Sequence, residues 1–116
     1  MSEGLRGYYV KSIGQNRGAP RIWLEGEQVS RAGLGPGQKF DVIVHGRTIT
    51  LKACADGSRT VSAKKKGEKL RPVIDINSAE LLQIFDGMDA VRMIVRDGEV
   101  IFAPIASEMR KAERLD

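Results

Sequence analysis

The two halves of the chain repeat one order of structural signals. Pro20 precedes a short apolar strand pattern, and Pro72, 52 positions later, precedes another. Leu51 and Phe102 end the apolar patterns of the two halves and lie 51 positions apart, so a single-residue slip aligns the copies. Strand, helix, turn and hairpin agree in order, which indicates a structural duplication rather than chance.

Each half is expected to fold as a strand, a second strand, a short helix and a β-hairpin. Strands are indicated by apolar residues that alternate with polar ones, and helix ends by capping residues and glycine. Asn77 or Ser78 is expected to cap the second helix, with Glu80 three residues after Asn77 as in a capping box. The first half predicts strands over 5–13 and 21–25, a loop over 14–19, a helix within 27–32 and a hairpin over 40–51. The second half predicts a strand over 59–63, a basic loop over 64–69, a strand over 73–76, a helix over 79–85 and a hairpin over 91–102.

Neither half can bury its apolar faces alone, because a sheet of this size needs a partner. We therefore expect a mainly β protein with short helices, in which two repeats, residues 5–54 and 59–105, close into one pseudo-twofold barrel or sandwich. The single domain is expected to span 1–106. Residues 107–116 hold strong helix formers and predict a C-terminal helical tail or a linker.

Basic side chains gather in two segments at equivalent places in the repeats. The first arm, residues 5–21, holds four basic side chains and no acid, and the second arm, residues 59–71, holds six and one acid. Two arms related by a pseudo-twofold axis would present positive charge to two stretches of phosphate backbone. The candidate nucleic-acid-binding residues are Arg6, Lys11, Arg17, Arg21, Arg59, Lys64, Lys65, Lys66, Lys69 and Arg71.

The sequence predicts no catalytic, metal or cofactor site. The chain has one cysteine, Cys54, and one histidine, His45, which are too few ligands for a structural zinc site. We expect Cys54 to be a small residue at the end of a strand and His45 to be exposed in a hairpin turn. Tyr8 and Tyr9 are expected to pack as core or edge residues of the sheet. Trp23 alternates with the apolar Ile22 and Leu24, so we expect it on the second face of the sheet or at an interface. No Walker loop or Ser/His/Asp set is present. We therefore expect a protein that is not an enzyme.

The chain has no apolar stretch near the roughly 20 residues that a membrane span needs. Its first residues lack the apolar core of a signal peptide. With one cysteine and no internal disulfide, we expect a cytoplasmic protein with no membrane partner.

The phrases Pro20-Arg-Ile-Trp-Leu-Glu-Gly and Ala32-Gly-Leu-Gly-Pro-Gly-Gln-Lys-Phe-Asp-Val-Ile-Val-His-Gly-Arg-Thr-Ile-Thr-Leu51 resemble the AbrB/MazE/SymE type of swapped-hairpin (SpoVT-AbrB) barrel. The stretch from Pro72 to Phe102 follows the pattern more loosely, with Met88 or Asp89 in place of Gly37. The resemblance implies a swapped-hairpin β-barrel and DNA binding through the basic segments, as in transcription regulators and antitoxins. That family usually dimerises, so this chain is expected to be a monomeric pseudo-dimer or a homodimer.

The chain is also similar to the N-terminal segment of some DNA cytosine methyltransferases of mobile elements. Their Pro-Cys motif is absent, because Cys54 follows Ala53. The resemblance therefore implies a non-catalytic DNA-recognition domain. Three readings stay beside DNA binding: this methyltransferase-associated domain, a SymE-like toxin that cleaves RNA with arm residues and His45, and a protein-interaction module.

Overall fold

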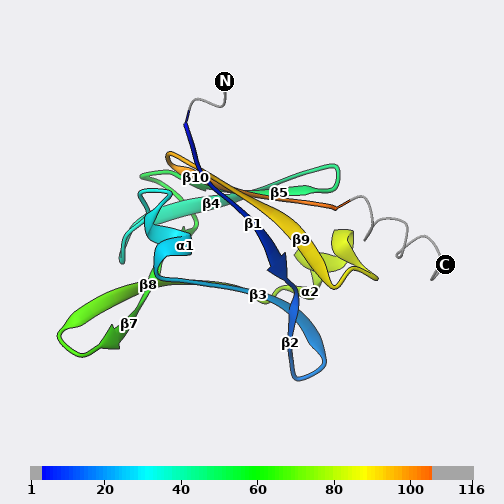
Figure 1. Cartoon of the computed structure of the whole chain (residues 1–116), viewed down its shortest axis with the longest axis horizontal. Helices are drawn as coiled ribbons and strands as arrows, with labels where there is room; N and C mark the ends of the chain where they lie inside the picture. Colours follow the sequence, from blue (N-terminus) through cyan, green and yellow to red (C-terminus); the bar gives the residue numbers. More distant parts are fainter. Residues whose placement is uncertain (1–3, 106–116) are drawn as a thin grey trace.

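The computed structural model describes residues 4–105, and it is mainly β, as predicted (Figure 1). Its strands form two sheets, and the larger has six strands in the order β1-β9-β10-β5-β4-β6, all neighbours antiparallel. The strands of this sheet are β1 (Leu5–Ser12), β9 (Ala90–Arg96), β10 (Glu99–Ala103), β5 (Thr48–Ala53), β4 (Lys39–His45) and β6 (Arg59–Thr60).

The second sheet has four strands in the order β2-β3-β8-β7, also antiparallel throughout. The long strands β3 and β8 form its centre, and a hairpin extends from the start of each. The strands of this sheet are β2 (Gly14–Asn16), β3 (Ala19–Glu25), β8 (Lys69–Ile76) and β7 (Ser62–Lys66).

Short helical segments pack beside the four-stranded sheet. Helix α1 (Glu27–Ser30) contacts β3 and β8, and helix α2 (Ala79–Leu82) contacts β3 and continues into the 3₁₀ helix η1 (Gln83–Phe85). Ser78 is the N-cap of α2, because its Oγ accepts the N–H of Leu81 at 3.3 Å. The predicted capping box, with Asn77 as the N-cap, is wrong. Glu80 lies two residues after the N-cap Ser78, whereas a capping box needs the acid three residues after it.

The core lies between the inner faces of the two sheets. Val91, Met93 and Val95 of β9 are fully buried and alternate with residues on the outer face, as their sequence pattern predicts. Ile22 and Leu24 of β3 face them from the smaller sheet and are also fully buried. Each such side chain contributes about 1.5–3 kcal/mol on burial, so the two sheets stabilise each other.

Strands from the two halves of the chain pair with one another. Strand β1 pairs with β9, and β6 pairs with β4. In the smaller sheet, β3 pairs with β8 so that Trp23 lies opposite Asp75, which is 52 positions later in the sequence. In the larger sheet, β5 pairs with β10 so that Thr50 lies opposite Ile101, which is 51 positions later.

Two segments that the sequence predicts as loops, residues 14–19 and 64–69, lie within β-hairpins. Residues 14–16 pair with Ala19–Arg21, and Ser62–Lys66 pair with residues 69–73. Both outer strands lie at a sheet edge, and Gly14, Gln15 and all of β7 are solvent-exposed, so these strands lack the apolar alternation by which a strand is recognised. Charged residues are a common feature of such edges, since they oppose pairing with another chain.

The described residues form two sheets rather than a closed barrel, so the prediction of a closed barrel is not met. The strand predicted over 59–63 is divided at Val61, where the chain passes from the larger sheet to the smaller. Val61 is buried, and both of its backbone polar groups are hydrogen-bonded. Its N–H donates to the Gln38 carbonyl, and its carbonyl accepts from the Gly37 N–H, each at 2.9 Å. The predicted tail, residues 107–116, lies outside the described residues.

Gly57 packs against the backbone of β4 too closely for any side chain. A Cβ built there would lie 2.6 Å from the nitrogen, carbonyl carbon and oxygen of Phe40. We expect Gly57→Ala to lower the free energy of unfolding by about 2 kcal/mol, since backbone atoms cannot move aside cheaply. Urea denaturation measures this change.

Gly35→Ala is the matched control. Gly35 has no neighbouring atom within 4 Å of a built Cβ. Its φ is not in the left-handed region. This substitution is expected to change stability by less than about 1 kcal/mol. Equal stability of the two variants would contradict the close packing at Gly57.

Candidate nucleic-acid interface

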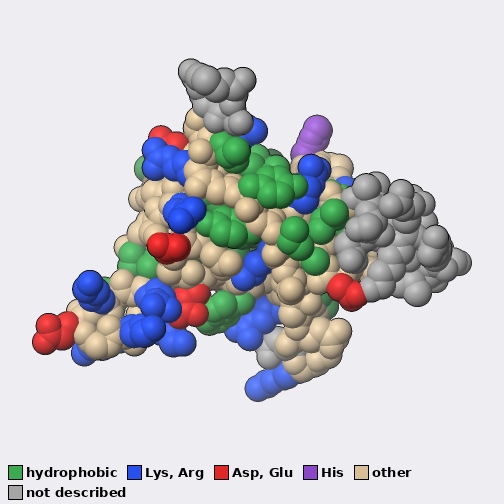
Figure 2. All heavy atoms as spheres, viewed as in Figure 1, with side chains coloured by type: hydrophobic (Ala, Val, Ile, Leu, Met, Phe, Trp, Pro, Cys, Tyr) green, Lys and Arg blue, Asp and Glu red, His purple; other side chains and the backbone are tan. Residues whose placement is uncertain are grey.

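The two basic hairpins lie at opposite ends of the four-stranded sheet. Each hairpin precedes its central strand, and β3 and β8 run antiparallel, so the turns are carried to opposite ends. Figure 1 shows both hairpins projecting beyond the larger sheet on the same side of the molecule. In Figure 2, Lys and Arg side chains gather over β7 and β8, with others near the β2–β3 turn.

The β7–β8 hairpin places four cations on one of its faces. Lys64 lies opposite Arg71, and Lys66 lies opposite Lys69. Because side chains alternate along a strand, these four share a face, whereas Lys65 points to the other. Like charges directly opposite each other destabilise a sheet, so this face favours an anion.

Glu25, the last residue of β3, lies on the outer face of the four-stranded sheet, the face away from the core, and contacts three groups. Its Oε1 is 3.7 Å from Lys64 Nζ and 3.6 Å from Arg71 Nη1. Its Oε2 accepts a hydrogen bond from Trp23 Nε1 at 3.2 Å. The hydrogen bond from Trp23 and the charges of Lys64 and Arg71 lower the pKa of Glu25 below its ordinary value, against partial burial, which raises it.

Arg21 is fixed on the same face by Asp75 and Trp23. Its Nε and Nη2 donate to the two carboxylate oxygens of Asp75 at 2.8 and 3.0 Å, a bidentate geometry. Its guanidinium carbon lies 4.5 Å from the centre of the Trp23 ring, in cation–π contact. The hydrogen-bonded Asp75 raises the pKa of Arg21 above its ordinary value. Arg21 is therefore held in one orientation.

The remaining candidates do not gather at this face. Arg6 lies on β1 in the larger sheet, with its Nη2 3.6 Å from Asp97 Oδ1. Lys11 is half-buried and donates to Gln28 Oε1 at 3.0 Å, and its burial lowers the pKa of its ammonium. Arg59 is half-buried on the edge strand β6. Arg17 is exposed at the β2–β3 turn, with φ of 56°.

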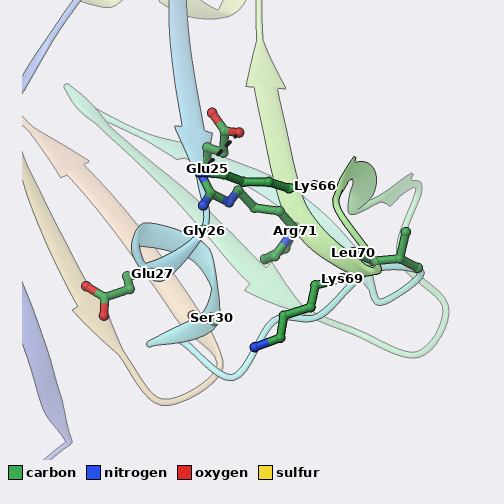
Figure 3. A pocket seen from close by; sticks show the side chains of 9 residues that line it. Glu25, Gly26, Glu27, Ser30, Lys66, Lys69, Leu70 and Arg71 are labelled. Carbon is green, nitrogen blue, oxygen red and sulfur yellow. Dashed lines mark ion pairs between the residues drawn. The ribbon is translucent and has the colours of Figure 1, made fainter.

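A groove of about 640 Å³ separates the β7–β8 hairpin from α1. Figure 3 shows Lys69 extending toward the space between β8 and α1, whereas Leu70 and Glu27 point away from each other to either side. A groove of about 350 Å³ lies beside the β2–β3 hairpin at α2 and η1, and its lining includes Asp86 and Asp89 and no basic residue. The two ends of the sheet therefore differ in charge.

Trp23, Glu25 and Asp75 belong to the candidate site, although the sequence did not single them out as binding residues. Trp23 does lie on the second sheet face, as its phase predicts, and Glu25 shares that phase. Asp75 lies on β8, a central strand of the four-stranded sheet, and faces away from the core with Trp23 opposite it. Tyr9 packs on the core as expected, whereas Tyr8 is 56% exposed.

His45 and Cys54 lie apart from this face. His45 is exposed at the end of β4, as predicted, and Cys54 is half-buried after β5, with its N–H bonded to the Lys39 carbonyl at 3.0 Å. Among residues 4–105, no three His, Cys, Asp or Glu side chains gather as metal ligands do. No helix within the same range is long and apolar enough to cross a bilayer.

Comparisons with known protein families, curated protein sequences and solved structures found no match to this chain. The arrangement of side chains in the protein itself is therefore the basis for a functional proposal.

The pKa of Glu25 reports whether the contacts at the outer face persist in solution. We expect Trp23→Phe to raise this pKa, because it removes the hydrogen bond with the largest effect, and Lys64→Gln to raise it less. The pairing of Glu25 stabilises the fold above the ordinary pKa of glutamate, and this contribution is lost as pH falls through the lowered pKa. NMR titration of the Glu25 carboxyl carbon measures these shifts, and an unchanged pKa in Trp23→Phe would contradict the assignment.

Proposed function

We propose that this chain is a DNA-binding module that holds the duplex against the outer face of its four-stranded sheet. The observation that carries the proposal is the placement of two basic hairpins at the two ends of one sheet, on one side of the molecule (Figure 1). Lysine and arginine side chains that contact phosphates supply most of the affinity in non-specific DNA binding. Contacts at two separate places also set the orientation of a protein on the duplex.

The second arm is the stronger candidate for phosphate contact. On one face of its hairpin Lys64 lies opposite Arg71 and Lys66 opposite Lys69, and Glu25 of β3 contacts the first of these pairs. An incoming phosphate chain would relieve the mutual repulsion of these cations. Arg21 is suited to a different role, because a guanidinium held in one orientation can present its remaining donors to one phosphate or one guanine.

We further propose that the two halves are copies of one unit in a swapped arrangement. The pairings support this reading, because β1 of the first half joins the second-half hairpin and β6 of the second half joins the first-half hairpin. The residues opposite each other at the centres of β3–β8 and β5–β10 are separated by the same 52 and 51 positions as the sequence repeat. The arrangement favours an AbrB-like regulator or antitoxin, or the recognition domain of a DNA methyltransferase.

The lysines of the second arm can be tested directly. We expect the triple variant Lys64/Lys65/Lys66→Ala to bind random-sequence duplex DNA more than about tenfold more weakly. The slope of log affinity against log salt should fall by about two, because Lys64 and Lys66 lie on the proposed DNA face and each lost phosphate contact removes about 0.9. Fluorescence anisotropy at several salt concentrations measures both quantities.

The variant Arg31/Lys39/Arg47→Ala is the matched control. It removes the same charge from exposed positions at the end of α1, at the start of β4 and in the β4–β5 turn. Affinity should change little, except through net charge at low salt. If both triple variants lose affinity equally, the binding is not located at the arm. If wild-type affinity is independent of salt, phosphate contacts are not the basis of binding.

Glu25 opposes DNA binding in this proposal. Its carboxylate neutralises Lys64 and Arg71 in the free protein and would itself face the phosphates. We expect Glu25→Gln to bind duplex DNA several-fold more tightly at low salt, with a smaller difference at high salt. Glu80→Gln, at an exposed position on α2, is the control of equal charge. Weaker binding by Glu25→Gln alone would contradict the role given to this acid.

A further inference from the structure

The outer face of the six-stranded sheet carries an apolar row that crosses five strands. Tyr8 lies opposite Ile94, Ile94 opposite Ile101, Ile101 opposite Thr50, and Thr50 opposite Ile43. Cross-strand neighbours point to the same side of a sheet, so these residues form one continuous surface. This surface lies on the side of the core away from the basic hairpins.

Several side chains of this face are unusually exposed for their type. Tyr8 is 56% exposed, Val10 67% and Ile43 46%. Figure 2 shows hydrophobic side chains gathered over β1 and β9. Contiguous exposed apolar surface of this kind marks an interaction site rather than ordinary surface.

A charged row runs beside the apolar row, two residues away on each of β9, β10, β5 and β4. Arg96 lies opposite Glu99, Glu99 opposite Lys52, and Lys52 opposite Asp41. The charges therefore alternate in sign across β9, β10, β5 and β4. A nucleic acid, with negative charge throughout, does not match such a row.

We propose that this face binds a second copy of the chain. A twofold axis parallel to the strands and between β10 and β5 reverses the order of the strands in the partner. Arg96 then faces Asp41 of the partner subunit, and Glu99 faces the partner subunit's Lys52, so each charge in the row meets its opposite. The same operation lays Ile94 on Ile43 of the partner subunit and Ile101 on the partner subunit's Thr50, the self-complementary arrangement that a twofold dimer requires.

In this homodimer the two four-stranded sheets face outward in opposite directions. The apolar rows are removed from water at the interface, and the basic hairpins of both subunits stay exposed. The dimer itself does not depend on the proposed DNA binding, because different faces of the chain carry the two properties.

Sedimentation equilibrium of the full chain, without DNA, over roughly a hundredfold range of concentration tests this proposal. We expect a reversible monomer–dimer equilibrium for the wild type. The single variants Lys52→Glu and Glu99→Lys should each dimerise at least about tenfold more weakly, because each brings like charges together across the axis. Ile43→Arg, at an exposed position of the apolar row, should also weaken the dimer, and circular dichroism should show that all three remain folded.

A mixture of the two charge variants is the decisive sample. In a mixed dimer, the glutamate introduced by Lys52→Glu would face the lysine introduced by Glu99→Lys. The second pair across the axis keeps its native glutamate and lysine, so attraction is restored in both pairs. We expect the mixture to dimerise as the wild type does, although neither variant does so alone. A wild type that stays monomeric, variants that dimerise unchanged, or a mixture no better than its components would each overturn the proposal.

Discussion

The antiparallel pairing of β3 with β8 is the constraint on which the rest of the structure depends. Ile22 pairs with Ile76 and Leu24 with Ile74, and these four buried side chains form one wall of the core. Because the strands run in opposite directions, the hairpins that precede them extend from opposite ends of the sheet. A parallel pairing would bring both hairpins to one end. The distribution of positive charge is therefore a direct consequence of strand direction.

The outer side of the same strand pair combines cations with acids that hold them in place. Asp75 orients Arg21, and Glu25 holds Lys64 and Arg71 near Trp23. Ordered cations lose less conformational entropy when an anion binds, but each acid also cancels part of the attraction. The two hairpins differ in this respect, since the groove beside the β2–β3 hairpin is lined by acids without a basic residue. A pseudo-symmetric arrangement of strands thus presents an asymmetric charge pattern.

The elements that the sequence predicts well are those with one buried and one exposed face. Alternation identified the strand around Ile22 and both hairpins of the larger sheet, and it placed Trp23 on the outer face. The sequence predicts a loop for residues 64–66 of β7, because the strand is exposed throughout and burial leaves no period in its sequence. The ion pairs of Glu25 with Lys64 and of Asp75 with Arg21 were missed for another reason. They join residues about 40 to 54 positions apart, and only the pairing register brings these together.

The central claim is that DNA binds the outer face of the four-stranded sheet, and an NMR titration with duplex DNA tests it most directly. Amide signals of the β7–β8 hairpin, the β2–β3 turn and the centre of β3 and β8 are expected to shift as DNA is added, and the shifts should diminish as salt is raised. Signals from Ile94, Ile101 and Thr50, on the opposite outer face, are expected to stay in place. Shifts confined to that opposite face, or none at all, would contradict the claim.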